Sequence, residues 1–97
     1  MMYYIYILYS EEFDKYYIGH TSDVDRRLIE HNETSENSYT SRLRPWVLKG
    51  TFQVGEDRGL AIRIEKHIKR QKSRIYLETL LNRASIEEII MRIKADG

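Results

Sequence analysis

Tyr3-Tyr4-Ile5-Tyr6-Ile7-Leu8-Tyr9 is the stretch that decides the fold of this 97-residue chain. Aromatic and β-branched residues fill it, as they do pleated strands. A similar composition returns at Tyr16-Tyr17-Ile18-Gly19 after a polar stretch, so the two segments predict a β-hairpin. Because side chains alternate along a strand, Tyr6 lies on one face of the first strand, and Tyr17 and Gly19 share a face of the second. Tyr6 and Tyr17 become cross-strand neighbours in some registers, and the loop leaves the register open.

Two further elements and a polar loop follow the hairpin. Residues 23–33 carry apolar side chains at helical spacing, and Ser22 stands where a helix cap is expected. Residues 46–52 follow Pro45 and are rich in strand-forming residues, which predicts a third strand. Residues 33–41 are rich in Ser, Thr, Asn and Glu, and we expect an exposed, mobile loop there that could order on a ligand.

The C-terminal half predicts helices. An apolar stripe at helical spacing is formed by Leu60, Ala61, Ile64 and Ile68. A short helix is expected over about residues 74–81, and Ser85 with Glu88 resembles a capping box before an amphipathic helix over about residues 86–95. The expected fold class is α/β (α+β), a small three-stranded antiparallel sheet flanked by helices.

Length and composition bound the class of protein. Ninety-seven residues are enough for one core, so we expect a single domain over residues 1–97, with the motif-bearing part at about residues 3–81. The chain has no cysteine, which excludes disulfides and thiolate zinc sites and favours the reducing cytoplasm. The apolar N-terminus is too short to span a bilayer, so no membrane association is expected.

Charge is distributed unevenly along the chain. Residues 1–40 carry three Lys or Arg against eight Asp or Glu, whereas residues 41–76 carry ten against three. A basic block inside a chain of net charge +1 favours a directional face for a polyanion such as nucleic acid. A merely solvated charged helix face is the alternative.

The two tyrosine-rich segments precede three residues of catalytic type, Arg27, His31 and Glu65. A hydroxyl can orient or deprotonate water, a guanidinium can hold a phosphate, and a carboxylate can bind a divalent metal ion. On the predicted helix, Arg27 and His31 point toward the sheet. Each residue also has a structural reading: His31 could be a satisfied core histidine, and Glu65 an ion-pair partner of Lys69.

The order Tyr4-Ile5-Tyr6, Tyr17-Ile18-Gly19, Arg27-Leu28-Ile29-Glu30-His31 and Ala61 to Glu65 resembles the GIY-YIG nuclease family. Tyr4 departs from the pattern, because the first triplet usually begins with glycine. The chain is most similar to the small stand-alone branch, which is little more than the nuclease domain found at the N-terminus of the excision-repair UvrC subunit. The resemblance implies a metal-dependent endonuclease that hydrolyses phosphodiester bonds in DNA, selects its substrate by structure and serves DNA repair or processing.

The resemblance also implies a role for each motif residue. Tyr6, aided by Tyr17 and His31, would activate water as base or positioner; Arg27 would contact the cleaved phosphate. Glu65 would hold one Mg²⁺ or Mn²⁺ ion, weakly in the absence of substrate, because it is a lone carboxylate. Asn82 is a loosely aligned candidate for an asparagine that many members carry. His20 and His67 match no required position and are predicted to be surface residues.

Other residues are candidates for contacts with DNA, with RNA and branched DNA as open alternatives. Gly19 would allow close backbone approach. The basic candidates are Arg42, Arg44, Lys69, Arg70, Lys72 and Arg74. Trp46 could stack on an unpaired base, although a core position is the simpler expectation.

The rival functions are a non-catalytic nucleic-acid-binding module and an interaction domain that uses the isoleucine face of the last helix to bind a protein partner. The oligomeric state stays open.

Overall fold

The computed structural model describes residues 1–34, 36, 38–81 and 83–95, without the side chains of residues 83–86, 89 and 94. Its sheet has three antiparallel strands in the order β2-β1-β3. They span β1 (Tyr3–Ser10), β2 (Lys15–Thr21) and β3 (Val47–Gly55). The predicted fold class is confirmed, and β3 extends three residues beyond the predicted third strand.

The strand register places the functional tyrosines on one face of the sheet. Tyr6 pairs with Gly19, and Leu8 pairs with Tyr17, so Tyr6 and Tyr17 are diagonal neighbours rather than a direct pair. Directly paired residues share a face, and alternation therefore assigns Ile18 and His20 to the opposite face. The central strand β1 contributes apolar side chains to both faces, which is why four consecutive residues from Ile5 to Leu8 are buried.

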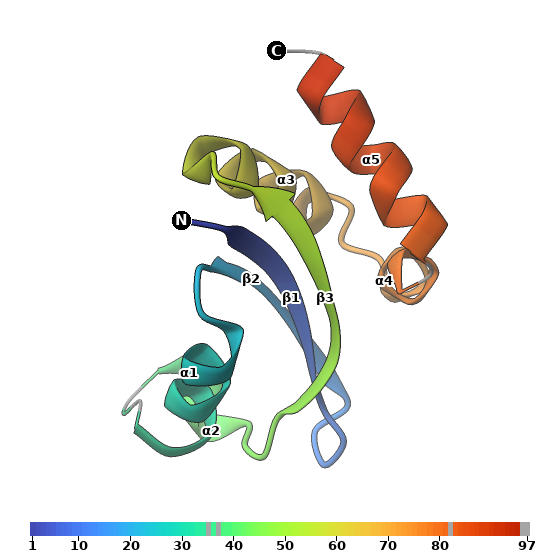
Figure 1. The fold of residues 1–97 in the computed structure, drawn as a ribbon. Helices are drawn as coiled ribbons and strands as arrows, with labels where there is room; N and C mark the ends of the chain where they lie inside the picture. Colours follow the sequence, from blue (N-terminus) through green and yellow to red (C-terminus); the bar gives the residue numbers. More distant parts are fainter. Residues whose placement is uncertain (35, 37, 82, 96–97) are drawn as a thin grey trace.

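Helices cover both faces of the sheet (Figure 1). On the tyrosine face lie α1 (Val24–Ile29), the π-helical turn η1 (Glu30–Thr34) and α2 (Tyr39–Arg42). The buried residues of the small core there are Tyr6, Leu8 and Trp46. On the opposite face lie α3 (Arg58–Arg70), α4 (Arg74–Leu80) and α5 (Arg83–Ala95). The larger core beneath them includes Ile5, Ile7 and Ile64.

The first helix differs from its prediction in its cap and its winding. Asp23, not Ser22, is the N-cap, and its carboxylate accepts a hydrogen bond from the backbone N–H of Arg26 at 3.1 Å. Aspartate is among the strongest N-cap residues, and Thr21 holds it by accepting from the Asp23 N–H. The predicted helical stretch continues to Thr34, but as a π-helix from Glu30.

The polar stretch 33–41 is more ordered than predicted within the described residues. Ser38 and Ser41 form a reciprocal capping box that starts α2. Thr40 in this helix is buried, so the stretch contributes to the core rather than forming an exposed loop throughout. The Arg44–Pro45 peptide bond that leads to β3 is cis.

The C-terminal helix packs on the protein's own core. It begins at Arg83, so Ser85 lies inside the helix and the predicted capping box there is wrong. Ile90 is buried in the larger core, and Ile93 packs against it. The side chains of Ile86 and Ile89 lie outside the described residues. Among the described residues, every helix is too short or too polar to cross a lipid bilayer.

Candidate active site

Tyr6 reaches across β2 with its ring over Gly19. A Cβ atom at position 19 would stand 2.4 Å from the Tyr6 hydroxyl oxygen, so only glycine leaves room for the phenol. The predicted close approach at Gly19 therefore involves the protein's own tyrosine. The Tyr6 hydroxyl lies 2.9 Å from Nε2 of His31, and both side chains are buried.

His31 is held from both sides of its ring. Its Nδ1 lies 2.8 Å from the hydroxyl of Thr40, while its backbone carbonyl accepts a hydrogen bond from Nε of Arg44 at 2.6 Å. Trp46 fixes Thr40 in turn, because its indole N–H donates to the Thr40 carbonyl at 2.8 Å. The result is a buried chain of hydrogen bonds from Tyr6 through His31 to Thr40.

The electrostatic environment keeps both Tyr6 and His31 neutral at pH 7. Burial raises the pKa of Tyr6 to about 12, opposed by the neighbouring Arg27 guanidinium and reinforced by the charge of Glu65. Burial also lowers the pKa of His31 to about 4, and the positive charge of Arg27 adds to this effect. A neutral imidazole has one donor and one acceptor nitrogen, so His31 can accept a hydrogen bond from one hydroxyl and donate a hydrogen bond to the other.

Arg27 stands at the open side of this buried chain. Its guanidinium donates to the Glu30 carboxylate at 2.9 Å, and its side chain is 37 % exposed. The Asp23 carboxylate, one helical turn before Arg27, accepts from a backbone N–H and caps the helix. The neighbouring Arg26 points to solvent, with a side chain that is 66 % exposed. A guanidinium with several donors can hold Glu30 and still present donors to a phosphate.

Glu65 lies on α3, at the edge of the sheet formed by β2. Both of its carboxylate oxygens have partners: Oε1 lies 2.7 Å from Nδ1 of His20, and Oε2 accepts from the ammonium group of Lys69 at 2.8 Å. The Glu65 side chain is 17 % exposed. The ion pair between Glu65 and Lys69 that the sequence suggests is present, and His20 is a second partner of Glu65.

His20 is the functional-site residue that the sequence reasoning missed. It was predicted to be a surface residue, but its side chain is only 20 % exposed and contacts Glu65. The signal for it was strand alternation: a residue next to Gly19 must point to the other face, which the Glu65 helix covers. His67 is half-buried on α3 rather than a surface residue.

Tyr17 joins the two halves of the site. Its ring centroid lies 6.3 Å from that of Tyr6 and 4.9 Å from that of His31. The ammonium of Lys69 lies 5.5 Å from the Tyr17 ring centroid, although Lys69 belongs to the helix on the opposite face. The site therefore bends around the β2 edge. Next to Tyr17 lies a groove of about 180 Å³, and its lining includes Lys69, Lys72 and Ser73.

The basic residues predicted to contact nucleic acid fall into different settings. Lys72 lines the groove, and Arg70 and Arg42 have exposed side chains. Arg44 is tied to the carbonyl of His31 under the site. Arg74 is held by the Asp14 carboxylate through contacts of 2.7 and 2.8 Å. Trp46 is buried, so the expectation that it stacks on a base is wrong, while the core expectation is confirmed. Asn82 lies outside the described residues.

Glu65 is the candidate ligand for the divalent cation that the family resemblance implies. Among the described residues, no three His, Asp or Glu side chains gather in a way that could hold a metal ion. Glu65 instead offers one carboxylate, and its Oε2 atom faces the positive charge of the Lys69 ammonium. The negative charge of Glu65 thus balances a cation at this position. Oxygen ligands of this kind suit Mg²⁺, which keeps much of its hydration shell.

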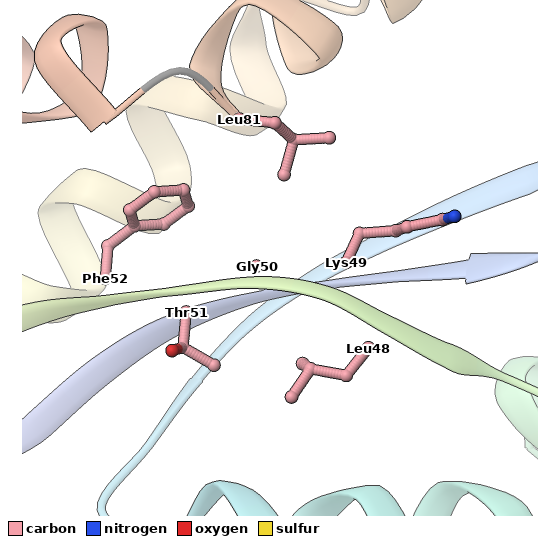
Figure 2. A pocket seen from close by; sticks show the side chains of 6 residues that line it. All are labelled: Leu48, Lys49, Gly50, Thr51, Phe52 and Leu81. Atoms are coloured by element: carbon pink, nitrogen blue, oxygen red, sulfur yellow. The ribbon is translucent and has the colours of Figure 1, made fainter.

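A separate cavity of about 270 Å³ lies at the other edge of the sheet (Figure 2). Phe52 and Leu81 lie on one side of β3 and Thr51 and Leu48 on the other, with Lys49 nearby. Lys49 is the single ionisable residue among the six that line it. Its lining contains no carboxylate, histidine or tyrosine, unlike the edge at β2.

Comparisons with known proteins identify the family of the chain. The model of the GIY-YIG catalytic domain matches residues 2–79, which include every motif residue from Tyr6 to Glu65. The chain is 35 % identical over 79 residues to the UPF0213 protein VNG_2274C of Halobacterium salinarum, an alignment that covers 81 % of this chain and 99 % of that protein. No solved structure gives a significant match. The chain is thus a member of the GIY-YIG nuclease family.

Proposed function

We propose that this protein is a metal-dependent endonuclease that hydrolyses phosphodiester bonds in DNA. The observation that carries the proposal is a chain of contacts around β2 that connects Tyr6 with Glu65. The Tyr6 and Tyr17 ring centroids lie 6.3 Å apart, the Lys69 ammonium lies 5.5 Å from the Tyr17 ring centroid, and it binds Glu65 at 2.8 Å. The Arg27 guanidinium lies close enough to Tyr6 to lower the pKa of its hydroxyl. A hydroxyl, a guanidinium and a carboxylate are the groups that phosphodiester hydrolysis needs: one for water, one for the phosphate and one for a cation.

Tyr6 acts as a positioner of the attacking water in this proposal. A phenol with a pKa of about 12 is neutral at pH 7, so it is not a resting base. We assign His31 the tautomer with its hydrogen on Nδ1, so that Nδ1–H donates to the Thr40 hydroxyl and Nε2 accepts from the Tyr6 hydroxyl. The Tyr6 oxygen can then accept hydrogen bonds from the Arg27 guanidinium and from the attacking water. Tyr17 packs against both rings and limits their movement.

Arg27 and Glu65 supply the charges. Arg27 binds the scissile phosphate and stabilises the negative charge that develops there, while Glu30 keeps its guanidinium in place. Glu65 holds the divalent ion, Mg²⁺ or Mn²⁺, that GIY-YIG nucleases generally use; when bound, this ion neutralises phosphate and leaving-group charge. Lys69 and Lys72 line the adjacent groove and hold the flanking phosphates.

We further infer that residues 1–97 act as one nuclease unit that selects DNA by structure, in DNA repair or processing. The contacts proposed for Lys69 and Lys72 are to phosphates, and contacts to phosphates carry no sequence information. Branched DNA, flaps and RNA belong in the substrate test for this reason.

A cleavage panel tests the proposal. Labelled single-stranded, duplex, flap and branched DNA and RNA are incubated with wild type, Arg27→Ala and Arg27→Lys, in Mg²⁺ and in chelator. We expect Mg²⁺-dependent cleavage of at least one DNA form, strong loss in Arg27→Ala, and only partial recovery in Arg27→Lys, because an ammonium cannot form the bidentate contact. Salt-sensitive DNA binding without cleavage in any condition would contradict the proposal and establish the binding module.

A further inference from the structure

The two partners of the Glu65 carboxylate differ in how firmly they are held. His20 projects from a strand, next to the buried residues Ile18 and Gly19, and its side chain is 20 % exposed. Lys69 reaches Glu65 from the next helical turn through a long flexible side chain that is 46 % exposed. The contact of His20 with Glu65 therefore comes from a strand of the sheet, whereas the contact of Lys69 with Glu65 comes from an exposed side chain.

We propose that His20 is a positioning residue that fixes Glu65, while Lys69 is the exchangeable occupant of the oxygen that binds the metal ion. This inference rests on the proposed function for the identity of the metal ligand. It assigns different roles to two contacts of nearly equal length, 2.7 Å at Oε1 and 2.8 Å at Oε2.

The hydrogen-bond chemistry supports a fixed role for His20. A carboxylate oxygen only accepts, so the Nδ1 atom of His20 must carry the hydrogen in this contact. A ring N–H donated to a carboxylate restricts rotation of the carboxylate about its last bond, because one oxygen is then tied to the sheet. The other oxygen, Oε2, is thereby aimed at the open side of the β2 edge, where Lys69 and the Tyr17 ring lie.

The setting of Lys69 supports exchange. Its ammonium places positive charge at Oε2, so an incoming divalent cation replaces like charge with like charge. Lys69 also lies over the Tyr17 ring at 5.5 Å and lines the groove beside it, so the displaced ammonium keeps a favourable position from which it can contact a phosphate. Residues that orient metal ligands in this way typically change metal affinity about 10-fold to 100-fold when removed.

A titration with Mn²⁺ followed by NMR tests these roles without nucleic acid. Paramagnetic broadening of the backbone amide signals of β2 and α3 in labelled protein reports even weak binding near Glu65. The variants are His20→Ala, His20→Asn, Lys69→Met and Glu65→Gln, with His67→Ala as the matched control for loss of a histidine. His20→Asn keeps an amide donor near the Nδ1 position, and Lys69→Met keeps the side-chain stem over Tyr17.

We expect His20→Ala to require about 10-fold more Mn²⁺ for half-maximal broadening, and His20→Asn to recover most of that loss. Lys69→Met should need no more Mn²⁺ than wild type, since it removes a competing cation. His67→Ala should match wild type, and Glu65→Gln should abolish the local broadening. If His20→Ala does not fold, His20→Gln replaces it as the variant that lacks the contact with Glu65. The glutamine side chain places its amide one bond beyond the position of Nδ1.

Three results would overturn the assignment: no effect of His20→Ala, no recovery in His20→Asn, or a loss in Lys69→Met as large as in His20→Ala. Absence of broadening around Glu65 in wild type would overturn it as well. The proposed nuclease activity is judged separately, because the expected Mn²⁺ pattern in a protein that cuts no nucleic acid would sustain the roles of His20 and Lys69 and reject the nuclease.

Discussion

The hydroxyl of Tyr6 occupies the space in which any side chain at position 19 would begin. A glycine in a strand interior usually weakens the strand, so its presence in β2 needs a reason. Here the reason is steric, because the Tyr6 ring must pass over β2 to meet His31 and approach the sheet edge. Gly19 of the second triplet therefore leaves room for the ring of Tyr6 of the first triplet.

Gly19→Ala is expected to separate folding from activity. The new methyl group would stand 2.4 Å from the Tyr6 oxygen and would push the ring away from His31. Overpacking of this kind costs about 1–3 kcal/mol of unfolding free energy, and the displaced hydroxyl should reduce cleavage far more than it reduces DNA binding. Urea unfolding, a binding titration and a cleavage assay measure the three effects. Full cleavage activity in Gly19→Ala would show that the position of Tyr6 does not matter.

The buried His31 predicts a dependence of stability on pH. Its pKa is about 4 in the folded protein and about 6.5 in an unfolded chain, so between these values the unfolded chain binds more protons. The stability that His31 contributes is therefore complete above about pH 6.5 and is lost as the pH falls to 4. A shift of this size corresponds to about 3 kcal/mol.

His31→Gln removes the titrating group and keeps a polar atom near Nε2. We expect wild type to lose about 3 kcal/mol more unfolding free energy than His31→Gln between pH 7.5 and pH 4, measured by urea unfolding at both pH values. Comparison of the two losses cancels the contribution of the carboxylates. Equal losses in both proteins would mean that His31 is not buried in its neutral form.

Residue-level prediction succeeded where a motif spacing was available and failed where the partner came from a distant element. Arg27 and His31 were predicted to point toward the sheet, and both lie next to Tyr6 of the central strand. His20 was missed because the sequence alone does not show which face the Glu65 helix covers. Arg44 was assigned to nucleic acid, but it binds the carbonyl of His31, a contact that no local pattern predicts.

The elements at the β2 edge determine which basic residues face a substrate. Helix α3 ends at Arg70 and α4 starts at Arg74, so the two arginines are close in sequence. Arg74 bends back to the β1–β2 turn, where its guanidinium donates to both carboxylate oxygens and to the backbone carbonyl of Asp14. The Tyr16 ring centroid lies 5.6 Å from the guanidinium carbon. Arg70 has an exposed side chain at the end of the helix that carries Glu65.

Arg70→Ala and Arg74→Ala form a matched pair. We expect Arg70→Ala to weaken binding of labelled DNA and to lower the slope of log affinity against log salt by about 1, because one phosphate contact is lost. Arg74→Ala should leave the slope unchanged, since its guanidinium is already held by Asp14. A larger effect of Arg74→Ala would mean that DNA displaces the Asp14 contact and that the sequence-based assignment of Arg74 is right.

Element boundaries followed local chemistry that the sequence only partly reveals. Both Ser22 and Asp23 are good caps, and the choice of Asp23 depends on the Thr21 hydroxyl at the end of β2. The stretch 33–41 has the composition of a loop, yet Thr40 is buried because His31 and Trp46 both bind it. Tertiary contacts thus overrode local composition in both places.

The sheet separates two cores, and the candidate site lies around its β2 edge. Figure 1 shows α1 and α2 on one face of the sheet and α3 on the other. Tyr6 belongs to the smaller core and contacts His31, whereas Glu65 lies on α3, and the contacts of Tyr17 with Tyr6 and with Lys69 connect the two sides around β2. The sequence predicted a three-stranded antiparallel sheet flanked by helices, and the family resemblance supplied the order of the site residues. The burial of Ile90 in the chain's own core weakens the interaction-domain alternative.

The rate of a single turnover with Glu65→Gln tests the central claim most directly. Enzyme in excess over the best DNA substrate is mixed with Mg²⁺, and cleavage is compared with wild type at matched occupancy, established in a separate binding titration. The account predicts a rate at least about 100-fold lower in Glu65→Gln with DNA affinity little changed, because a carboxylate that holds the metal ion is lost. Cleavage by Glu65→Gln at the wild-type rate would contradict the assignment of Glu65 as the metal ligand of a nuclease.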